Sequence, residues 1–253
     1  MSTEGYVLIA IGKRYEKLVE NFFSTLRHCG DERSVYAITE PDKDELYRSA
    51  KTDFERNGTI PKITLDRTLP FDHTIFLDAD VLCAADTQHV WDYFKSNSQP
   101  IQCFGTEKEI DRFWLSSDEQ YRKDLGFTIP KIHSGLMYFN KERLDPSFFS
   151  YMRDDVFPNF DSICHNHPPG FAYKGSRPDQ EIYSIAMGKF GYHVPEIWEQ
   201  NCITILKDSC DLPITKPWFK YKHGNEGTDI PFLHIFNTGS DHYRTMHTKI
   251  LNS

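Results

Sequence analysis

The sequence predicts an α/β fold in which a mostly parallel central sheet is covered by helices on both faces. Short apolar runs alternate with segments of helical periodicity through about the first hundred residues, in the order strand, helix, strand, helix, strand, strand. The 253 residues contain no internal repeat, low-complexity tract or linker, and this length suits one large domain with a substantial core. We therefore expect a single domain.

The first three elements follow from simple patterns. Residues 6–11 form a continuous apolar run, which is typical of a buried strand. Residues 34–38 are predicted to form the second strand. The helix between them ends at Gly30, and its apolar side chains recur at helical spacing: Tyr15, Leu18, Val19, Phe22 and Leu26.

The next elements lead to a pair of carboxylates. Thr39 or Asp42 is expected to cap a second helix that ends at Gly58. Residues 60–65 predict a weaker strand, and residues 74–77 predict another that leads directly into Asp78. A short helix is expected after residues 86–87, with Val90, Trp91 and Phe94 on its apolar face.

The alternation loosens in the second half of the chain. Residues 107–128 are charged with interleaved aromatic residues and predict a surface excursion, whereas 132–139 predict a strand and 141–156 a helix interrupted at Pro146. Residues 158–177 are rich in Pro, Gly and His and predict a loop. Pro178 suits the first position of a helix that runs to Phe190. Residues 232–236 predict a last strand and residues 243–251 a terminal helix.

Composition excludes several classes of function. The chain has 29 basic and 37 acidic residues, and this net charge of −8 argues against general nucleic-acid binding, which needs basic surface. The amino-terminal residues do not resemble a signal peptide, and no apolar stretch has the length of a membrane span. Six scattered cysteines without a CxxC pair favour reduced thiols. We expect a cytoplasmic protein.

The most informative segment is the turn Asp78–Ala79–Asp80 that follows the strand at 74–77. In an open α/β sheet, ligands bind at the carboxyl ends of strands. Hard divalent cations prefer carboxylate oxygens, and two such ligands leave room for phosphate oxygens on the same ion. A solvated turn is the alternative. We favour a functional site, because apolar runs flank both carboxylates and burying them without a partner is costly.

This segment resembles the Asp-x-Asp core of the metal-dependent glycosyltransferases with the GT-A fold, most closely the retaining family 8 group of glycogenin and related galactosyltransferases. The resemblance extends over most of residues 6–234. Lys62 stands 18 residues before Asp80, the spacing of the family's lysine that reaches the sugar donor. His133-Ser134-Gly135 takes the place of a more usual Asn-Ser-Gly.

The resemblance implies a nucleotide sugar as donor, with UDP as the nucleotide, and a saccharide or glycan as acceptor. It implies a nucleotide-binding part at about residues 1–105 and an acceptor part at about 106–253. Asp179 and Gln180 correspond to the pair that faces the reacting sugar, and Asp78, Asp80 and His234 to the metal ligands. The residues implied for donor binding are Ala10, Ile11, Gly12, Tyr15, Lys62, Asp78, Ala79, Asp80, His133, Ser134, Gly135, Asn237 and Gly239.

The chemistry of the implied metal site favours Mn²⁺ over Mg²⁺, because a mixed carboxylate and imidazole shell suits manganese better. The metal would stabilise the leaving diphosphate. The family's lysine after its histidine ligand is absent here, and His242 or Arg244 could replace it. Stereochemistry stays open at this point: Asp179 or Gln180 would lie near the anomeric carbon of a retaining enzyme, and Asp179 or Glu181 could be the base of an inverting one.

Two other functions compete with glycosyl transfer. A sugar-phosphate nucleotidyltransferase has a related core, but the segment Gly12-Lys13-Arg14 is short for the basic glycine-rich loop that such enzymes carry. A non-catalytic domain that binds nucleotide sugars or glycans is the other alternative. The presence of Lys62 together with both aspartates and His234 argues against it.

Overall fold

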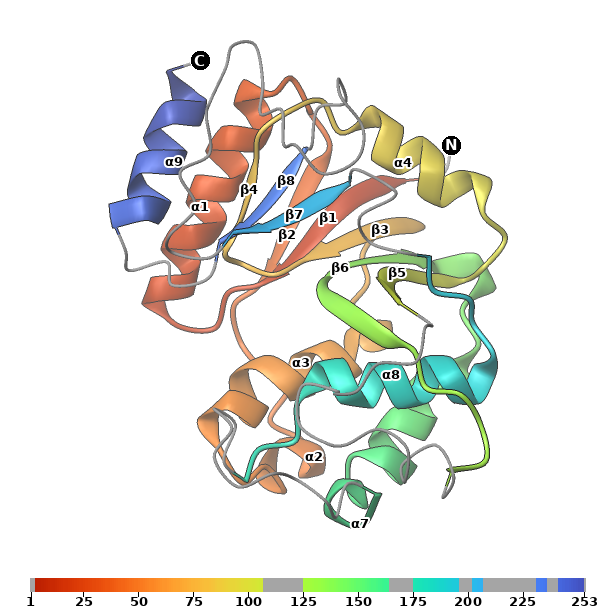
Figure 1. The fold of residues 1–253 in the computed structure, drawn as a ribbon. Helices are drawn as coiled ribbons and strands as arrows, with labels where there is room; N and C mark the ends of the chain where they lie inside the picture. The colour runs from red at the N-terminus through yellow and green to blue at the C-terminus, as the bar shows by residue number, and fades with distance from the viewer. Residues whose placement is uncertain are drawn as a thin grey trace.

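A computed structural model describes residues 3–106, 125–163, 175–195, 202–206, 231–235 and 241–252. At its centre lies a five-stranded sheet of order β2-β1-β3-β6-β5 (Figure 1). Its strands are β1 (Glu4–Ile9), β2 (Ser34–Ile38), β3 (His73–Leu77), β5 (Ile101–Thr106) and β6 (Lys131–Asn140). Strand β1 pairs in parallel with β2 and β3, and β6 runs antiparallel to β3 and β5. Four of the five strands therefore point the same way, as the sequence predicts.

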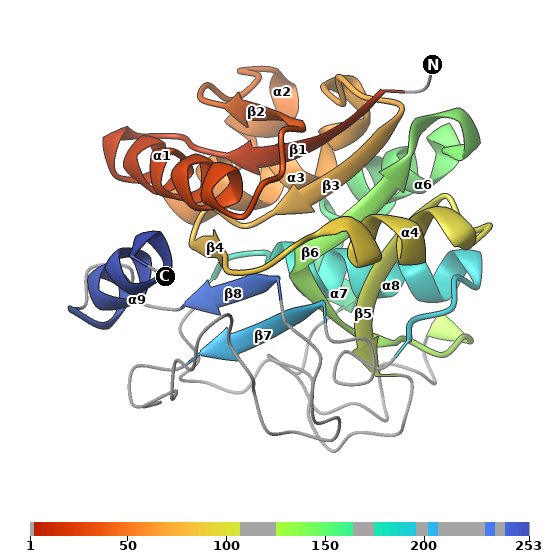
Figure 2. The same cartoon turned by 90° about the horizontal axis from the view of Figure 1, so that it is seen from above.

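Helices cover both faces of this sheet (Figures 1 and 2). Helices α1 (Lys13–His28) and α4 (Gln88–Ser96) lie on one face, and α9 (Asp241–Leu251) packs beside α1. The other face carries α3 (Ile60–Ile63), α6 (Pro146–Ser150), α7 (Phe160–Ile163) and α8 (Asp179–Phe190). A short helix α2 (Glu45–Arg48), capped by the Asp44 side chain, precedes α3.

The alternation of side chains along the strands explains this three-layer arrangement. On β1, Val7 and Ile9 pack with the α3 and α8 layer, whereas Tyr6 and Leu8 pack with the α1 and α4 layer. All four are buried, as expected for a strand with helices on both faces. The run is continuously apolar because its alternate side chains are buried in two separate cores, one on each face of the sheet.

A second, smaller sheet brings a distant segment to the end of β3. It consists of β4 (Val81–Cys83), β8 (Phe232–Ile235) and β7 (Ile203–Leu206), in the order β4-β8-β7. Strands β4 and β8 are antiparallel, and Val81 lies opposite His234. The register places His234 one residue away from Asp80, although about 150 residues of chain separate them.

The prediction of a strand at residues 60–65 is wrong. This segment contains α3 and a 3₁₀ turn at Leu65–Arg67. All six residues are buried, and a segment buried on every side looks alike in sequence whether it is helix or strand. Pro61 explains the outcome, because it cannot donate to a sheet ladder but suits the first turn of a helix.

Other boundaries differ from the prediction in smaller ways. The expected helix that ends at Gly58 is broken after α2, and a π-helical turn at Glu55–Thr59 continues directly into α3. The predicted loop at 158–177 contains α7, and its residues 164–174 lie outside the described residues. Strands β4, β5 and β7 were not expected. Each is only three to six residues long, which leaves little periodicity to detect.

Most of the expected surface excursion lies outside the described residues. The division into a nucleotide-binding part and an acceptor part stays a prediction. Among the residues that the structure describes, no helix is both long and apolar enough to cross a bilayer.

A buried ion pair joins the segment before α3 to the segment before α8. The Arg177 guanidinium contacts Glu55 through Nε (2.9 Å) and Nη2 (2.8 Å), and the two side chains are 6% and 0% exposed. Two further bonds connect the same segments: Thr59 donates to the Arg177 carbonyl oxygen, and the hydroxyls of Thr52 and Ser176 lie 2.9 Å apart. These contacts fix the start of α8 against α3.

Replacing Arg177 with methionine should lower the free energy of unfolding by about 3–5 kcal/mol, because it leaves the buried Glu55 carboxylate without its cation. Urea denaturation monitored by circular dichroism measures the effect. Lys17→Met is the control, since the ion pair of Lys17 with Glu20 is exposed and should contribute less than about 1 kcal/mol. Equal losses in the two variants would contradict the role assigned to the buried pair.

Candidate active site

A cavity of about 590 Å³ lies at the carboxyl ends of β1 and β3. This is the position expected for a ligand site in an open α/β sheet. Most of the side chains that the sequence singles out line it: Ile11, Tyr15, Lys62, Asp78, Ala79, Asp80, His133, Ser134, Gly135, Asp179, Gln180 and His234. Six separate parts of the chain thus meet in one cavity.

The acidic turn, Asp78–Ala79–Asp80, is held by backbone hydrogen bonds to three strands. The Asp78 N–H donates to the carbonyl oxygen of Gly135 on β6 (3.1 Å), and the Val81 N–H donates back to the Asp78 carbonyl oxygen (3.2 Å). The Ile235 N–H donates to the Asp80 carbonyl oxygen (3.1 Å). The turn therefore has little freedom, and its two carboxylates are held in place.

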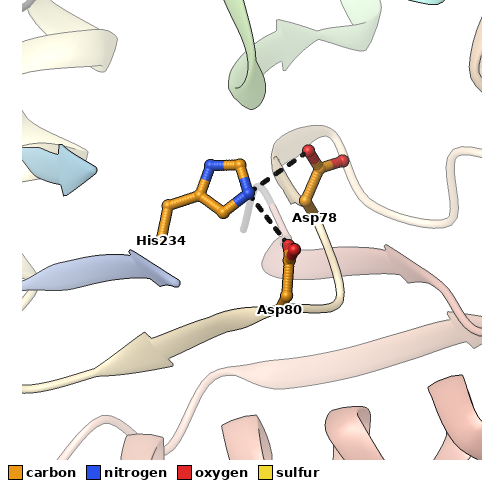
Figure 3. Close-up of side chains that lie close together, drawn as sticks. All are labelled: Asp78, Asp80 and His234. Carbon is orange, nitrogen blue, oxygen red and sulfur yellow. Dashed lines mark ion pairs between the residues drawn. The ribbon is translucent and has the colours of Figure 1, made fainter. Parts of the chain in front are cut away.

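Both carboxylates face the same nitrogen of His234 (Figure 3). The His234 Nε2 atom lies 2.9 Å from Asp80 Oδ1 and 3.9 Å from Asp78 Oδ2. One ligand atom from each residue lies within 4.8 Å of the others. Two carboxylates and an imidazole nitrogen form a donor set that fits a divalent cation, so the three residues constitute a candidate metal site.

Lys62 joins the acidic turn to the start of α8. Its Nζ atom lies 2.7 Å from Asp78 Oδ1 and 2.6 Å from Asp179 Oδ2, and the Ser134 hydroxyl donates to the same Asp179 oxygen (2.8 Å). Burial alone would lower the pKa of Lys62, but the charges of Asp179 and Asp78 outweigh burial and raise it. Lys62 is therefore a fixed cation between two carboxylates.

The site nevertheless has more negative than positive charge. Burial raises the pKa of Asp78, and the neighbouring Asp80 and Asp179 raise it further, against the opposing effect of Lys62 and His234. The pKa of His234 is also above its ordinary value, because Asp80 and Asp78 outweigh the effect of its burial. Burial is the main cause of the first shift and the two carboxylates cause the second, but the close approach of the carboxylates contributes to both, and a bound cation would offset their charge.

His133 lines the cavity next to His234 and is itself largely buried. Its Nε2 atom is 3.0 Å from His234 Nδ1, and the two rings meet edge to face with centroids 5.1 Å apart. Gly135 makes room for them: a Cβ atom there would lie 2.7 Å from the His133 ring and 2.9 Å from the His234 ring. Any larger residue at 135 would push the rings apart.

Comparison with solved structures identifies the fold. The galactosyltransferase LgtC, in complex with donor and acceptor sugar analogs, matches with a TM-score of 0.55 at 12% identity, over 98% of this chain and 95% of that one. The apo form of mouse xyloside xylosyltransferase 1 matches with a TM-score of 0.53 at 12% identity, over 94% and 99%. The bifunctional glycosyltransferase WbbM matches with a TM-score of 0.53 at 10% identity, over 81% of this chain and 40% of that one.

The chain has the GT-A fold. This confirms the fold that the sequence predicts. No protein-family model matches the sequence, and no curated protein matches it either.

Within this GT-A fold, four of the predicted donor-binding residues do not line the cavity or cannot be placed. Ala10 is buried, and its N–H donates to the carbonyl oxygen of Ile38 on β2. Gly12 precedes α1 with a φ of 102°, a backbone conformation that favours glycine, and turns the chain so that Tyr15 reaches the cavity. Asn237 and Gly239 lie outside the described residues.

Sequence reasoning missed several residues that line the cavity: Ile9, Asp53, Phe54, Asn57, Gly58 and Pro178. Four of them come from the helical segment that leads into α3. Asp53 and Asn57 are four residues apart, the spacing at which helical side chains share a face. If residues 53–63 are read as one helix, Asp53 and Asn57 are expected to lie near Lys62. The strand predicted at residues 60–65 excluded this expectation.

Glu181 also lines the cavity, two residues after Asp179, and its environment differs from that of the other carboxylates. Both carboxylate oxygens are buried, and no other described residue forms a hydrogen bond with either. Burial, reinforced by the nearby Asp179 charge, raises the pKa of Glu181 from its ordinary value of 4.5 to about 8. Glu181 is therefore protonated at neutral pH.

The pKa of Glu181 predicts how stability varies with pH. Between about pH 5 and 8 the folded protein holds a proton that the unfolded chain releases, so the wild type loses stability as pH rises. Glu181→Gln lacks this loss and should gain up to about 1.4 kcal/mol relative to the wild type for each pH unit in that range. Chemical denaturation across this range measures the difference. Glu142→Gln, which removes an exposed carboxylate, is the control, and an equal effect there would contradict the assignment.

Proposed function

We propose that the protein is a metal-dependent glycosyltransferase that moves a sugar from a UDP-linked donor to a saccharide or glycan acceptor, with retention of anomeric configuration. One observation carries the proposal. The candidate metal site of Asp78, Asp80 and His234 opens on the same cavity as Lys62 and Asp179. A cation site and a fixed lysine in one cavity suit a donor that contains a diphosphate.

The fold adds independent support. The similar structures include a galactosyltransferase and a xyloside xylosyltransferase, and both match over almost the whole of this chain. A fold does not by itself imply a function, so the argument rests on the site. Several residues that the family resemblance implies lie together in the cavity, in agreement with a shared function.

The size and lining of the cavity suit a nucleotide sugar. Its volume of about 590 Å³ is within the range of small-molecule sites. Tyr15 and Phe54 both line it and are 45% and 39% exposed. Exposed aromatic rings at a cavity can stack on a planar base or on the apolar face of a sugar. We assign them to donor binding.

A divalent cation held by Asp78, Asp80 and His234 would supply electrostatic stabilisation for the departing diphosphate. Manganese suits this mixed donor set better than magnesium, whose ligands are mostly oxygen atoms. The acidic turn is fixed by its three backbone hydrogen bonds, so the carboxylates need little rearrangement to bind the cation.

The residues of the opposite wall act on the sugar. Lys62 holds the Asp179 carboxylate in place, and Ser134 contributes a second bond to the same oxygen. The carboxylate is thus a fixed negative charge in the cavity, beside Gln180, and we assign both residues to the reacting sugar. Lys62 provides the positive charge for donor oxygens on the same side.

Retention is supported by the state of Glu181. An inverting enzyme needs a general base that can accept a proton from the acceptor hydroxyl. Glu181 is buried and its raised pKa, about 8, keeps it mostly protonated at neutral pH, which disfavours that role. Asp179 is occupied by Lys62 and Ser134, which favours a positioning role over proton transfer.

The test is transfer from a panel of nucleotide sugars with Mn²⁺ and simple saccharide acceptors. We expect release of UDP from one of the UDP-sugars, and loss of that release on metal chelation. A binding domain would instead be stabilised thermally by the nucleotide without releasing UDP. A nucleotidyltransferase would release pyrophosphate from a nucleoside triphosphate and a sugar phosphate.

Asp80→Asn should lower the rate of transfer by about 100-fold or more, because it removes a charged metal ligand while keeping the size of the side chain. Initial rates with Mn²⁺ measure the loss. The matched control is Asp53→Asn, which changes another aspartate of the cavity that is not part of the candidate metal site and should keep the rate within a few-fold of the wild type. Full activity of Asp80→Asn would show that the metal site is wrongly assigned.

A further inference from the structure

We infer that His133 is a positioning residue for His234: it accepts a hydrogen bond that orients the His234 imidazole toward the metal. This role is distinct from the donor binding that the sequence predicts for His133, which stays a prediction. The inference rests on the metal site of the proposed function, but it does not depend on which sugar is transferred.

The contact between the two rings is direct and buried. Their nitrogens, His133 Nε2 and His234 Nδ1, lie 3.0 Å apart, a hydrogen-bond distance. The residues are 7% and 3% exposed, so water does not compete for the bond. The ring planes lie at 74° to each other, so the rings do not stack, and their contact is made through the two nitrogens.

The two nitrogens of His234 have different tasks. Nε2 faces the carboxylates of Asp80 and Asp78, and it is the nitrogen that could bind a cation. A metal-bound imidazole is neutral, so its hydrogen is then on Nδ1. That hydrogen points to Nε2 of His133, which must accept it. His133 in turn carries its own hydrogen on Nδ1, an atom that is buried and has no hydrogen-bond partner among the described residues.

A metal ligand of this kind usually donates its second N–H to a carboxylate, a backbone carbonyl or water, and the acceptor fixes the orientation of the ring. Here the acceptor is a second imidazole. Unlike a carboxylate, a neutral imidazole adds no negative charge to a site that already contains Asp78, Asp80 and Asp179. The pair therefore orients His234 without increasing the charge imbalance.

The backbone is arranged to bring the rings together. His133 comes from β6 and His234 from β8, which belong to different sheets. Gly135 lies between the two rings, and a Cβ atom at this position would come within 2.9 Å of both. The Gly135 carbonyl oxygen also accepts the Asp78 N–H, so the same residue anchors the acidic turn. One short segment thus positions two of the three proposed ligands.

The experiment uses Mn²⁺ alone as the probe, titrated at constant pH and followed by the electron paramagnetic resonance signal of the free ion. His133→Met removes the acceptor and fills a similar volume, and should weaken Mn²⁺ binding by about 10- to 100-fold. His133→Gln places an amide oxygen near the position of Nε2 and should restore affinity to within a few-fold of the wild type. Unchanged affinity of His133→Met would overturn the inference.

Two controls separate positioning from a general structural effect. If His133 acts through His234, His133→Met should have no further effect on affinity in a His234→Gln background, and an additive effect there would contradict the inference. His73→Gln changes a partly buried histidine at the opposite end of β3, hydrogen-bonded to Tyr138, and should leave Mn²⁺ binding unchanged.

A measurement on the wild type covers the case in which the variants do not fold. Long-range ¹H–¹⁵N correlation spectra with Mg²⁺ bound should show both His133 and His234 carrying hydrogen on Nδ1, and hydrogen on Nε2 of His133 would contradict the inference. Failure of the wild type to bind any divalent cation would remove the inference together with the metal site. Binding of Mn²⁺ without sugar transfer would remove the proposed activity and leave the inference intact.

Discussion

The buried cation of Lys62 is the interaction on which the rest of the site depends. It holds Asp78, at the end of β3, and Asp179, at the start of α8, within 2.7 Å of one ammonium group. Two carboxylates could not approach so closely in a buried place without it. Buried ion pairs add little net stability, because desolvation offsets much of the attraction. The value of Lys62 is therefore placement: it extends from α3 and joins the carboxylates at the end of β3 and at the start of α8.

The charges around Lys62 explain the remaining features of the cavity. One lysine does not balance Asp78, Asp80 and Asp179, so the pKa of Asp78 is raised by burial and by its neighbours. Glu181 avoids adding a fourth charge by keeping its proton. A neutral His133, rather than another carboxylate, supports His234. The negative charge of the cavity therefore comes from Asp78, Asp80 and Asp179, and a divalent cation can compensate it. The ion pair of Arg177 with Glu55 fixes the start of α8 against the segment that leads into α3.

The parts of the fold that could be predicted are those with a local cause. The central strands appear as apolar runs, and the acidic turn stands out because it ends one of them. Residues 60–65 were misassigned because complete burial removes the periodicity that separates helix from strand, although Pro61 disfavours a strand. The contact of His133 with His234 could not be predicted. It spans 101 residues and depends on the register of β8 against β4, a strand too short to recognise.

The most direct test of the account is a crystal of the protein grown with Mn²⁺ and UDP and measured at a wavelength where manganese scatters anomalously. The account predicts one strong anomalous peak within bonding distance of Asp78, Asp80 and His234 Nε2, with the UDP diphosphate on the same ion and Lys62 still bound to Asp179. An anomalous peak elsewhere, or UDP bound in the cavity with no metal between these three residues, would contradict it.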